Sequence, residues 1–527
     1  MKIKIGHLIT FLTLLSSCHV YDIVIQNGYI YDGSGGPAYK ADVAIEEERI
    51  VRIDSSISQR SKHEIDATNL AVAPGFIDLH AHLSPITLYP AGSSAIMQGV
   101  TTALGGPDGG SPFPLRSYLD ELQQKQLGLN VAYLIGHNTI RNHVMGPVDR
   151  TPSEQELEKM KALIEEAMLD GAFGMSTGLK YVPGSFADVE EIVALANIAA
   201  KYDGIYTSHL RDEGTELVEA VEEAIDIGRR AAIPVILTHH KVMGASNWGS
   251  STQTLAMIDA ANERGIQVSA DQYPYTASHT SLRVVIPAWA FSHNDGNTFS
   301  SRCEDPTLRD SIRSGIINNL FNDRGGSDLS RIQFAKIEWK PSFVGKTLQD
   351  LLISEGIEPT LENAAEMIID IQLHRGAMCI YHVMDQKDVD RIMQHEATMI
   401  ASDGTISKIG SGHPHPRSYG TFPRVLGHYV RERAILDLPT AIRKMTDQPA
   451  RALELTDRGQ IRTGYWADIT IFDPSTIKDL ATFKEPHAYP EGIEYVIVNG
   501  TIVVNRGQLQ DARGGKILRK IKAIHMN

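Results

Sequence analysis

Two histidines separated by one residue, His80 and His82, end an apolar stretch that contains Phe76, Ile77 and Leu79. The stretch is typical of a β-strand, and residues i and i+2 of a strand project from the same face. Two imidazoles on one face can bind the same metal ion. Because a His-x-His pair also occurs in ordinary polar loops, this interpretation depends on further ligands at the ends of other strands.

Further candidate ligands follow other apolar runs. His209 ends one run, and His239 directly follows the next, so the adjacent His240 must point elsewhere. Asp403 ends the last run and precedes a glycine. A metal ion lowers the pKa of water from 15.7 to about 7, and a neighbouring carboxylate can take that proton and deliver it to a leaving amine. The pattern predicts metal-dependent hydrolysis with Asp403 as general base and acid.

The elements that must position these residues alternate between strand-like and helical patterns. The strand-like runs end at His82, Gly105, His137, Leu179, His209, His239, Tyr275 and Asp403. Eight strand–helix units over residues 74–447 predict an α/β fold, a (β/α)8 TIM-like barrel, which places the carboxyl ends of all its strands on one face. The excess length in residues 276–377 predicts an inserted subdomain that forms a lid over the barrel mouth.

Strand-like runs broken by glycine-containing turns occupy both ends of the chain. We expect residues 21–73 and 448–510 to form one small β-sandwich. Before them, Lys2 and Lys4 precede an apolar segment that ends in Leu15-Ser16-Ser17-Cys18. This ending resembles the lipobox of bacterial lipoproteins. It implies a signal peptide in residues 1–18 and a lipid anchor on Cys18, outside the cytoplasm in the periplasm or at the cell surface; an uncleaved apolar leader is the alternative.

The composition favours a soluble globular domain that acts on small molecules. Of the 527 residues, 42% are hydrophobic and 22% are charged, which is ordinary for a chain that buries a large core. The net charge of −14 argues against nucleic acid or an anionic membrane surface as a partner. Besides Cys18, only Cys303 and Cys379 are present, too few to indicate a disulfide framework.

The ligand pattern, in this order along the chain, resembles that of the amidohydrolase superfamily. Within it, several segments resemble the N-acyl-D-amino-acid deacylases (D-aminoacylases): residues 174–179, 208–214, 271–277, 415–424 and 462–468. The resemblance extends from about residue 21 to residue 500. It implies that the chain hydrolyses N-acyl-D-amino acids to a D-amino acid and a carboxylate with one or two Zn²⁺ ions.

One segment departs from the deacylase pattern. The deacylases carry Gly-Asn-Cys-Gly after the second strand, and its cysteine is a metal ligand, whereas this chain has Asp108 within Gly106-Pro107-Asp108-Gly109. Two ions about 3.5–4 Å apart need a shared anion. Lys180 follows the fourth strand, where other amidohydrolases carry a carboxylated lysine. We expect carboxylated Lys180 to bridge the ions, ahead of Asp108 and of a single-metal site.

The resemblance also implies that Lys241, Tyr275 and Arg417 bind the α-carboxylate of the substrate, and that Tyr275 helps to stabilise the oxyanion. His137 and His382 are expected to be structural. Two other activities of the superfamily stay open, a dihydropyrimidinase- or hydantoinase-like cyclic amidase and a D-aminoacyl dipeptidase. A surface-anchored binding protein with a vestigial barrel is the non-enzymatic alternative, but the intact ligand set argues against it.

Overall fold

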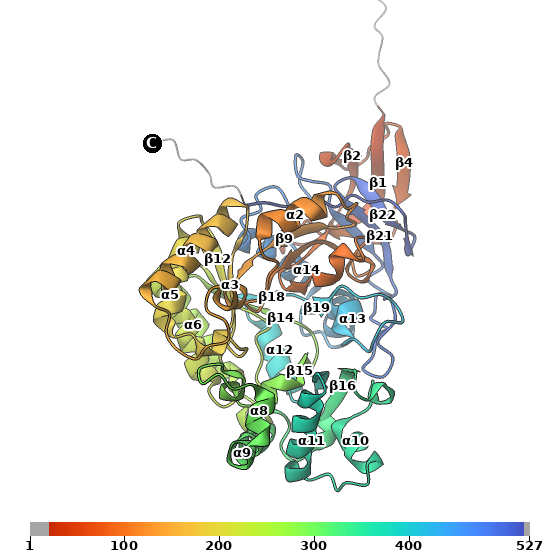
Figure 1. Ribbon diagram of the computed structural model, residues 1–527. Helices are drawn as coiled ribbons and strands as arrows, with labels where there is room; N and C mark the ends of the chain where they lie inside the picture. Colours follow the sequence, from red (N-terminus) through yellow and green to blue (C-terminus); the bar gives the residue numbers. More distant parts are fainter. Residues whose placement is uncertain (1–19, 521–527) are drawn as a thin grey trace, which may run out of the picture.

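The computed structural model describes residues 20–520 (Figure 1). The signal peptide predicted for residues 1–18, with Cys18, lies outside the described residues. Within residues 20–520, no helix combines the length and the apolar character needed to span a membrane.

Parallel strands form the centre of the molecule. One ladder has the order β6-β8-β9: β6 (Phe76–Asp78), β8 (Val100–Gly105) and β9 (Asn130–Tyr133). A second has the order β10-β11-β12-β13-β14-β18: β10 (Ile135–Gly136), β11 (Gly174–Gly178), β12 (Ile205–His209), β13 (Val235–Leu237), β14 (Val268–Gln272) and β18 (Thr398–Ile400). A third pairs β7 (Ala81–His82) with β19 (Gly404–Thr405).

The mixed α/β fold agrees with the sequence, but the strands of residues 20–520 do not close into one eight-stranded sheet. The ladders are separate because the strands are interrupted, as at Leu134 between β9 and β10. Single backbone bonds still cross the gaps: Leu134 N donates to Gly105 O over 2.9 Å, and Asp403 N donates to His80 O over 2.8 Å. The parallel strands therefore all end toward one side, where the predicted ligands lie.

Helices follow most of these strands and cover them from outside (Figure 1). They are α1 (Ser93–Ile96), α2 (Leu115–Gln123), α3 (His137–Val144), α4 (Glu154–Leu169), α5 (Val189–Ala200), α6 (Leu217–Ala231), α7 (Ser251–Glu263), α12 (Gln386–Gln394), α13 (Arg417–Arg424), α14 (Leu438–Met445) and α15 (Asp447–Ala452). Helix α4 begins at a capping box in which Ser153 accepts from Glu156 N, as its sequence predicts. The buried faces of these helices and the strands share one large apolar core.

Strands from both ends of the chain pair in one nine-stranded sheet. They are β1 (Tyr21–Ile30), β2 (Tyr39–Glu46), β3 (Arg49–Asp54), β4 (Ser61–Asp66), β5 (Ala71–Pro74), β20 (Ile469–Phe472), β21 (Ile493–Val498), β22 (Thr501–Asn505) and β23 (Gln508–Leu509). Strand β5 pairs in parallel with β1 and antiparallel with β20, so it joins the two ends directly. The hydrogen bonds thus join both ends of the chain in one continuous sheet, and the sequence predicted that these two ends assemble together.

The region between β14 and α12 contains an inserted subdomain, residues 278–381, with an apolar core of its own (Figure 1). Its antiparallel sheet has the order β15-β17-β16, with β15 (Ser278–Ser281), β16 (Ile332–Ile337) and β17 (Ala377–Tyr381). Its helices are α8 (Phe299–Glu304), α9 (Pro306–Asp323), α10 (Leu348–Ser354) and α11 (Leu361–Leu373). Residues of this subdomain line one side of the central cavity.

Candidate metal centre and active site

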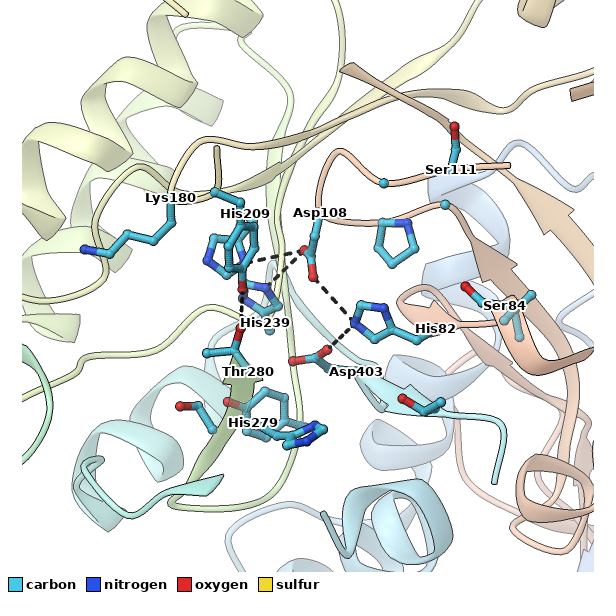
Figure 2. Close-up of a pocket in the computed structure, with 18 of the residues that line it drawn as sticks. His82, Ser84, Asp108, Ser111, Lys180, His209, His239, His279, Thr280 and Asp403 are labelled. Atoms are coloured by element: carbon cyan, nitrogen blue, oxygen red, sulfur yellow. Dashed lines mark hydrogen bonds and ion pairs between the residues drawn. The ribbon is translucent and has the colours of Figure 1, made fainter. Parts of the chain in front are cut away.

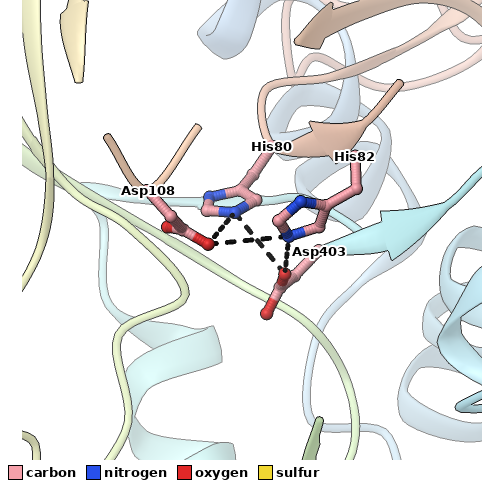
Figure 3. Close-up of side chains that lie close together, drawn as sticks. All are labelled: His80, His82, Asp108 and Asp403. Atoms are coloured by element: carbon pink, nitrogen blue, oxygen red, sulfur yellow. Dashed lines mark hydrogen bonds and ion pairs between the residues drawn. The ribbon is translucent and has the colours of Figure 1, made fainter. Parts of the chain in front are cut away.

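The first ligand group joins two histidines and two carboxylates at the ends of the parallel strands (Figure 3). His80 Nε2 lies 3.4 Å from Asp108 Oδ2 and 3.5 Å from Asp403 Oδ1. His82 Nε2 lies 3.5 Å from Asp108 Oδ2 and 3.0 Å from Asp403 Oδ1. One ligand atom from each residue lies within 4.8 Å of all the others, so the four can hold one metal ion together.

The second ligand group shares Asp108 with the first (Figure 2). Asp108 Oδ1 lies 3.5 Å from His209 Nδ1 and 3.3 Å from His239 Nε2. The carboxylate of Asp108 thus offers Oδ2 to one group and Oδ1 to the other. Asp108 could therefore supply an oxygen ligand to a metal ion in either group.

The amino group of Lys180 pairs with other carboxylates. Its Nζ donates to Asp212 Oδ2 over 2.7 Å and lies 3.6 Å from Asp323 Oδ2, and the side chain points away from Asp108 (Figure 2). Asp108, and not the Lys180 side chain, thus lies between the two ligand groups in this structure, whereas the bridging role of a carboxylated Lys180 stays a prediction. The physical reason is that Lys180 lies beyond the end of β11, where Asp212 attracts its ammonium group.

Several buried nitrogen atoms of this cluster make no hydrogen bond within the described residues. Both ring nitrogens of His80 and Nδ1 of His209 are buried and accept or donate no hydrogen bond there. Leaving such polar atoms unpaired is costly, and imidazole and carboxylate groups are the donor types that zinc binds. The chemistry of these residues therefore fits bound metal ions.

Hydrogen bonds behind the cluster fix the ligands. His239 N donates to Asp271 Oδ1 over 2.6 Å, and His239 Nδ1 lies 3.2 Å from Glu213 Oε1 and 2.7 Å from Lys241 Nζ. With the ring proton on Nδ1 and Glu213 as its acceptor, the Nε2 lone pair faces Asp108, as a metal ligand requires. Lys241 also forms an ion pair with Glu213. Burial raises the pKa of Glu213, but the charge of Lys241 and the nearby histidines outweigh it and hold that pKa well below its ordinary value.

Asp403, the predicted general base, faces the first group with one oxygen and Arg417 with the other. Arg417 Nη1 lies 2.7 Å from Asp403 Oδ2, and both side chains are buried. Burial raises the pKa of Asp403, but the Arg417 guanidinium and His80 outweigh it and hold the pKa below its ordinary value. Asp403 is therefore ionised at neutral pH and oriented, as a proton acceptor must be.

The predicted substrate residues separate into two sets. Lys241 and Arg417 line the cavity beside the ligand groups, but Tyr275 does not line it. Tyr275 N donates to Tyr273 O over 3.0 Å, and this tight turn after β14 sends the two rings in different directions. Tyr273 lines the cavity, with the Arg417 guanidinium 4.6 Å from its ring, and so takes the place expected for Tyr275.

Sequence reasoning missed several other cavity residues, among them Tyr181, Glu213, Tyr273 and His279. Glu213 and Tyr273 belong to segments 208–214 and 271–277, which resemble the deacylases, and this resemblance is the signal in the sequence that could have identified them.

The cavity has a volume of about 650 Å³, suited to a small molecule. His279 and Thr280 come from β15 of the inserted subdomain and face the cluster (Figure 2). His137 and His382 lie outside the lining.

A mixed α/β fold whose parallel strands end at two adjoining groups of histidine and aspartate ligands defines a metal-dependent hydrolase. The sequence profile of the amidohydrolase family matches residues 63–282 and 348–504. The chain belongs to the amidohydrolase family, as its motifs predict.

Two curated relatives and a solved structure match the chain almost end to end. The D-aminoacylase of Alcaligenes xylosoxydans xylosoxydans is 35% identical, over 96% of this chain and 99% of the relative. The N-acyl-D-glutamate deacylase of the same organism is also 35% identical, over 95% and 97%. The crystal structure of N-acyl-D-glutamate deacylase from Bordetella bronchiseptica, complexed with zinc and a phosphonate inhibitor, aligns with a TM-score of 0.82 at 33% identity, covering 95% of this chain and 100% of that one.

Proposed function

We propose that this protein is a metal-dependent N-acyl-D-amino-acid deacylase, which hydrolyses the amide bond to release a D-amino acid and a carboxylate. Similarity to deacylases over nearly the whole length of the chain supports this activity. The observation that carries the proposal is the position of Asp108, with one oxygen in each of two ligand groups. Such a shared carboxylate suits two Zn²⁺ ions, held by His80, His82, Asp108, His209 and His239.

Zinc bound at this site would polarise the amide carbonyl and lower the pKa of water. The protein's part is the movement of the proton. Arg417 holds Asp403 through Oδ2, which leaves Oδ1 facing His82 and the ligand group. From there Asp403 accepts the proton of the attacking water and returns it to the leaving nitrogen.

Three cavity residues are placed to hold the α-carboxylate and the developing charge. Lys241 and Arg417 lie in direct contact with His239 and Asp403, so a carboxylate two bonds from the reacting nitrogen can reach them. Burial holds the pKa of Tyr273 well above its ordinary value, so its hydroxyl stays protonated and can donate a hydrogen bond. In this proposal Tyr273 replaces Tyr275.

The activity is tested by incubating the zinc-loaded protein with N-acetyl-D-leucine, N-acetyl-D-glutamate, their L-enantiomers, hydantoins and dipeptides that end in a D-residue. We expect release of free D-amino acids from the N-acetyl-D substrates, and little from the L-enantiomers. Turnover of hydantoins alone would assign the protein to the cyclic amidases, and turnover of the dipeptides alone to the D-aminoacyl dipeptidases.

We further propose that the parallel ladders work as one barrel and that the inserted subdomain, residues 278–381, closes over its mouth. The backbone bonds that cross the interruptions support the first part, and the cavity residues of β15 support the second. Hydrogen exchange measured with and without a bound phosphonate analogue tests the lid. Slower exchange in the inserted subdomain is expected, and unchanged exchange there contradicts it.

We also propose that the protein is an exported lipoprotein anchored through Cys18. The support is the leader sequence alone, with Lys2, Lys4 and the Leu15-Ser16-Ser17-Cys18 ending. Fractionation of a bacterium that expresses the full chain should place the protein with the membranes. Cys18→Ser should release it or leave it unprocessed, whereas Cys303→Ser, which changes a buried cysteine, should not. Membrane association that is unchanged in Cys18→Ser would refute the anchor.

A further inference from the structure

A buried arginine of the inserted subdomain faces the cavity and has no anionic partner among the described residues. Arg324 ends helix α9, is 5% exposed and lines the cavity. Its Nη1 lies 2.8 Å from Met243 Sδ and 3.5 Å from Asp323 O, both weak or distant acceptors. Its Nε is buried with no partner within the described residues. Most of the donors of this guanidinium group are therefore available.

The other cations that line the cavity differ from Arg324 in this respect. Lys180 pairs with Asp212 over 2.7 Å, Lys241 pairs with Glu213, and Arg417 pairs with Asp403 over 2.7 Å. Across residues 20–520, no carboxylate lies within 4.0 Å of the Arg324 nitrogens. Within the described residues the protein therefore supplies no carboxylate to Arg324, and a bound ligand can supply one.

Burying an unpaired charge is expensive, and the surroundings of Arg324 offset only part of the cost. The C-terminal end of helix α9 offers the negative end of a helix dipole, worth about 0.3–1 kcal/mol at such sites. The ring of Tyr381, whose centroid lies 5.2 Å from Cζ, adds a weak cation–π contact. A cation held in this way beside a binding cavity is typical of a site whose partner arrives with the ligand.

The contacts of Arg324 indicate which part of a substrate it meets. The α-carboxylate lies two bonds from the scissile nitrogen, so its partners must touch the ligand groups, as Lys241 and Arg417 do. Arg324 instead contacts Met243, which lies two residues beyond Lys241 on the loop after β13. It therefore meets a group farther from the reacting bond.

We propose that Arg324 binds a second carboxylate of the substrate, carried by the side chain of the D-amino acid, and that the protein prefers N-acyl derivatives of acidic D-amino acids. The guanidinium group is planar and can hold a carboxylate through two parallel hydrogen bonds. A neutral side chain leaves the buried cation unpaired, which disfavours its binding. The two curated relatives match this chain equally, so overall similarity does not select the side chain.

The inference rests on the proposed deacylase activity, and the test separates the two. The measured quantity is the ratio of kcat/KM for N-acetyl-D-glutamate to that for N-acetyl-D-leucine. We expect the unchanged protein to favour the glutamate substrate and Arg324→Met to lower the ratio about 10- to 150-fold, the range for loss of a hydrogen-bonded charge. Arg324→Lys keeps the charge but not the two parallel donors of the guanidinium group. Its ratio should lie between those of the unchanged protein and Arg324→Met.

The control variant is Arg331→Met, which removes another cation of the same subdomain, paired with Asp328 and absent from the cavity lining. It should leave the ratio unchanged. Calorimetric binding of D-glutamate, the product, gives a second readout and should weaken in Arg324→Met in the same proportion. Melting curves show whether each variant is folded.

Three results would overturn the proposal. In the first, Arg324→Met changes the ratio and D-glutamate binding less than twofold. In the second, it lowers kcat/KM for both substrates equally, which would assign Arg324 to the α-carboxylate. In the third, the unchanged protein prefers N-succinyl-D-leucine to N-acetyl-D-glutamate, which would place the second carboxylate on the acyl group. Absence of turnover with every N-acyl-D-amino acid refutes the deacylase activity itself, and the substrate preference falls with it.

Discussion

Replacing Asp108 by asparagine tests whether this residue joins the two ligand groups. The variant keeps the size and an oxygen donor but removes the charge that both groups share. Without it, His209 and His239 are left as two neutral ligands, whereas the other group still has its carboxylate, Asp403, with its histidines. We therefore expect the ion at His209 and His239 to be lost first, so that metal content falls from about two ions per chain to about one.

The size of the effect follows from the contacts of Asp108. Its two oxygens lie 3.3–3.5 Å from a ring nitrogen of four histidines. Residues that hydrogen-bond to a metal ligand already contribute about 10- to 100-fold to metal affinity. Loss of the ligand itself should therefore lower metal affinity more than about 100-fold. Metal content is measured by mass spectrometry of the metals after gel filtration, and affinity by competition with a chelator.

Two further variants sharpen this test. Asp108→Cys supplies a thiolate, which also binds zinc, and should retain more metal than Asp108→Asn. Lys180→Met removes the side chain that the sequence predicts to bridge the ions. Because its Nζ donates to Asp212, metal content should not change. The reasoning is refuted if Lys180→Met loses metal, or if Asp108→Asn retains two ions with unchanged affinity.

Four other substitutions have distinct expected outcomes. Asp403→Asn should lower kcat about 10²- to 10⁴-fold while the ion held by the other group remains, and unchanged kcat would exclude Asp403 as the base. Tyr273→Phe should lower kcat/KM about 10- to 100-fold, since it loses a donor to a charged group, whereas Tyr275→Phe, which removes a buried hydroxyl without a partner among the described residues, should change it less than twofold. Glu191→Gln, which breaks a buried pair with Arg141, should lower the free energy of unfolding by about 3–5 kcal/mol at pH 7 in urea titrations. Burial raises the pKa of Glu191, but the hydrogen bond with His137 and the charge of Arg141 hold it below the ordinary value. The difference should therefore shrink as the pH falls below about 4.3, and a difference that grows in acid would contradict it.

Much of the site could be predicted because its residues follow recognisable strands. His80, His82, His209, His239 and Asp403 each come at the end of an apolar run, and parallel strands in one fold bring such ends together. Their types also limit the chemistry, since imidazole and carboxylate groups in such a set are metal ligands. These local signals were sufficient to predict the family and the metal-dependent chemistry.

Side-chain direction in the loops could not be predicted in the same way. Tyr273 and Tyr275 are two residues apart and would share a face on a strand, but the tight turn between them separates their rings. The division of the parallel strands into separate ladders could not be predicted either, because an interruption such as Leu134 does not change the hydrophobic pattern of the sequence. Arg324 gave no signal either, since its position depends on how a subdomain packs on strands far away in the chain.

The sequence by itself determined the ligand types, their order and the strands that present them, because these depend on short-range patterns. Only the tertiary structure decided which anion the two ligand groups share. Lys180 and Asp108 both follow parallel strands, but Asp212 draws the ammonium group of Lys180 away, whereas Asp108 turns an oxygen toward each group. That choice rests on charges from separate loops, which become neighbours only when the chain is folded.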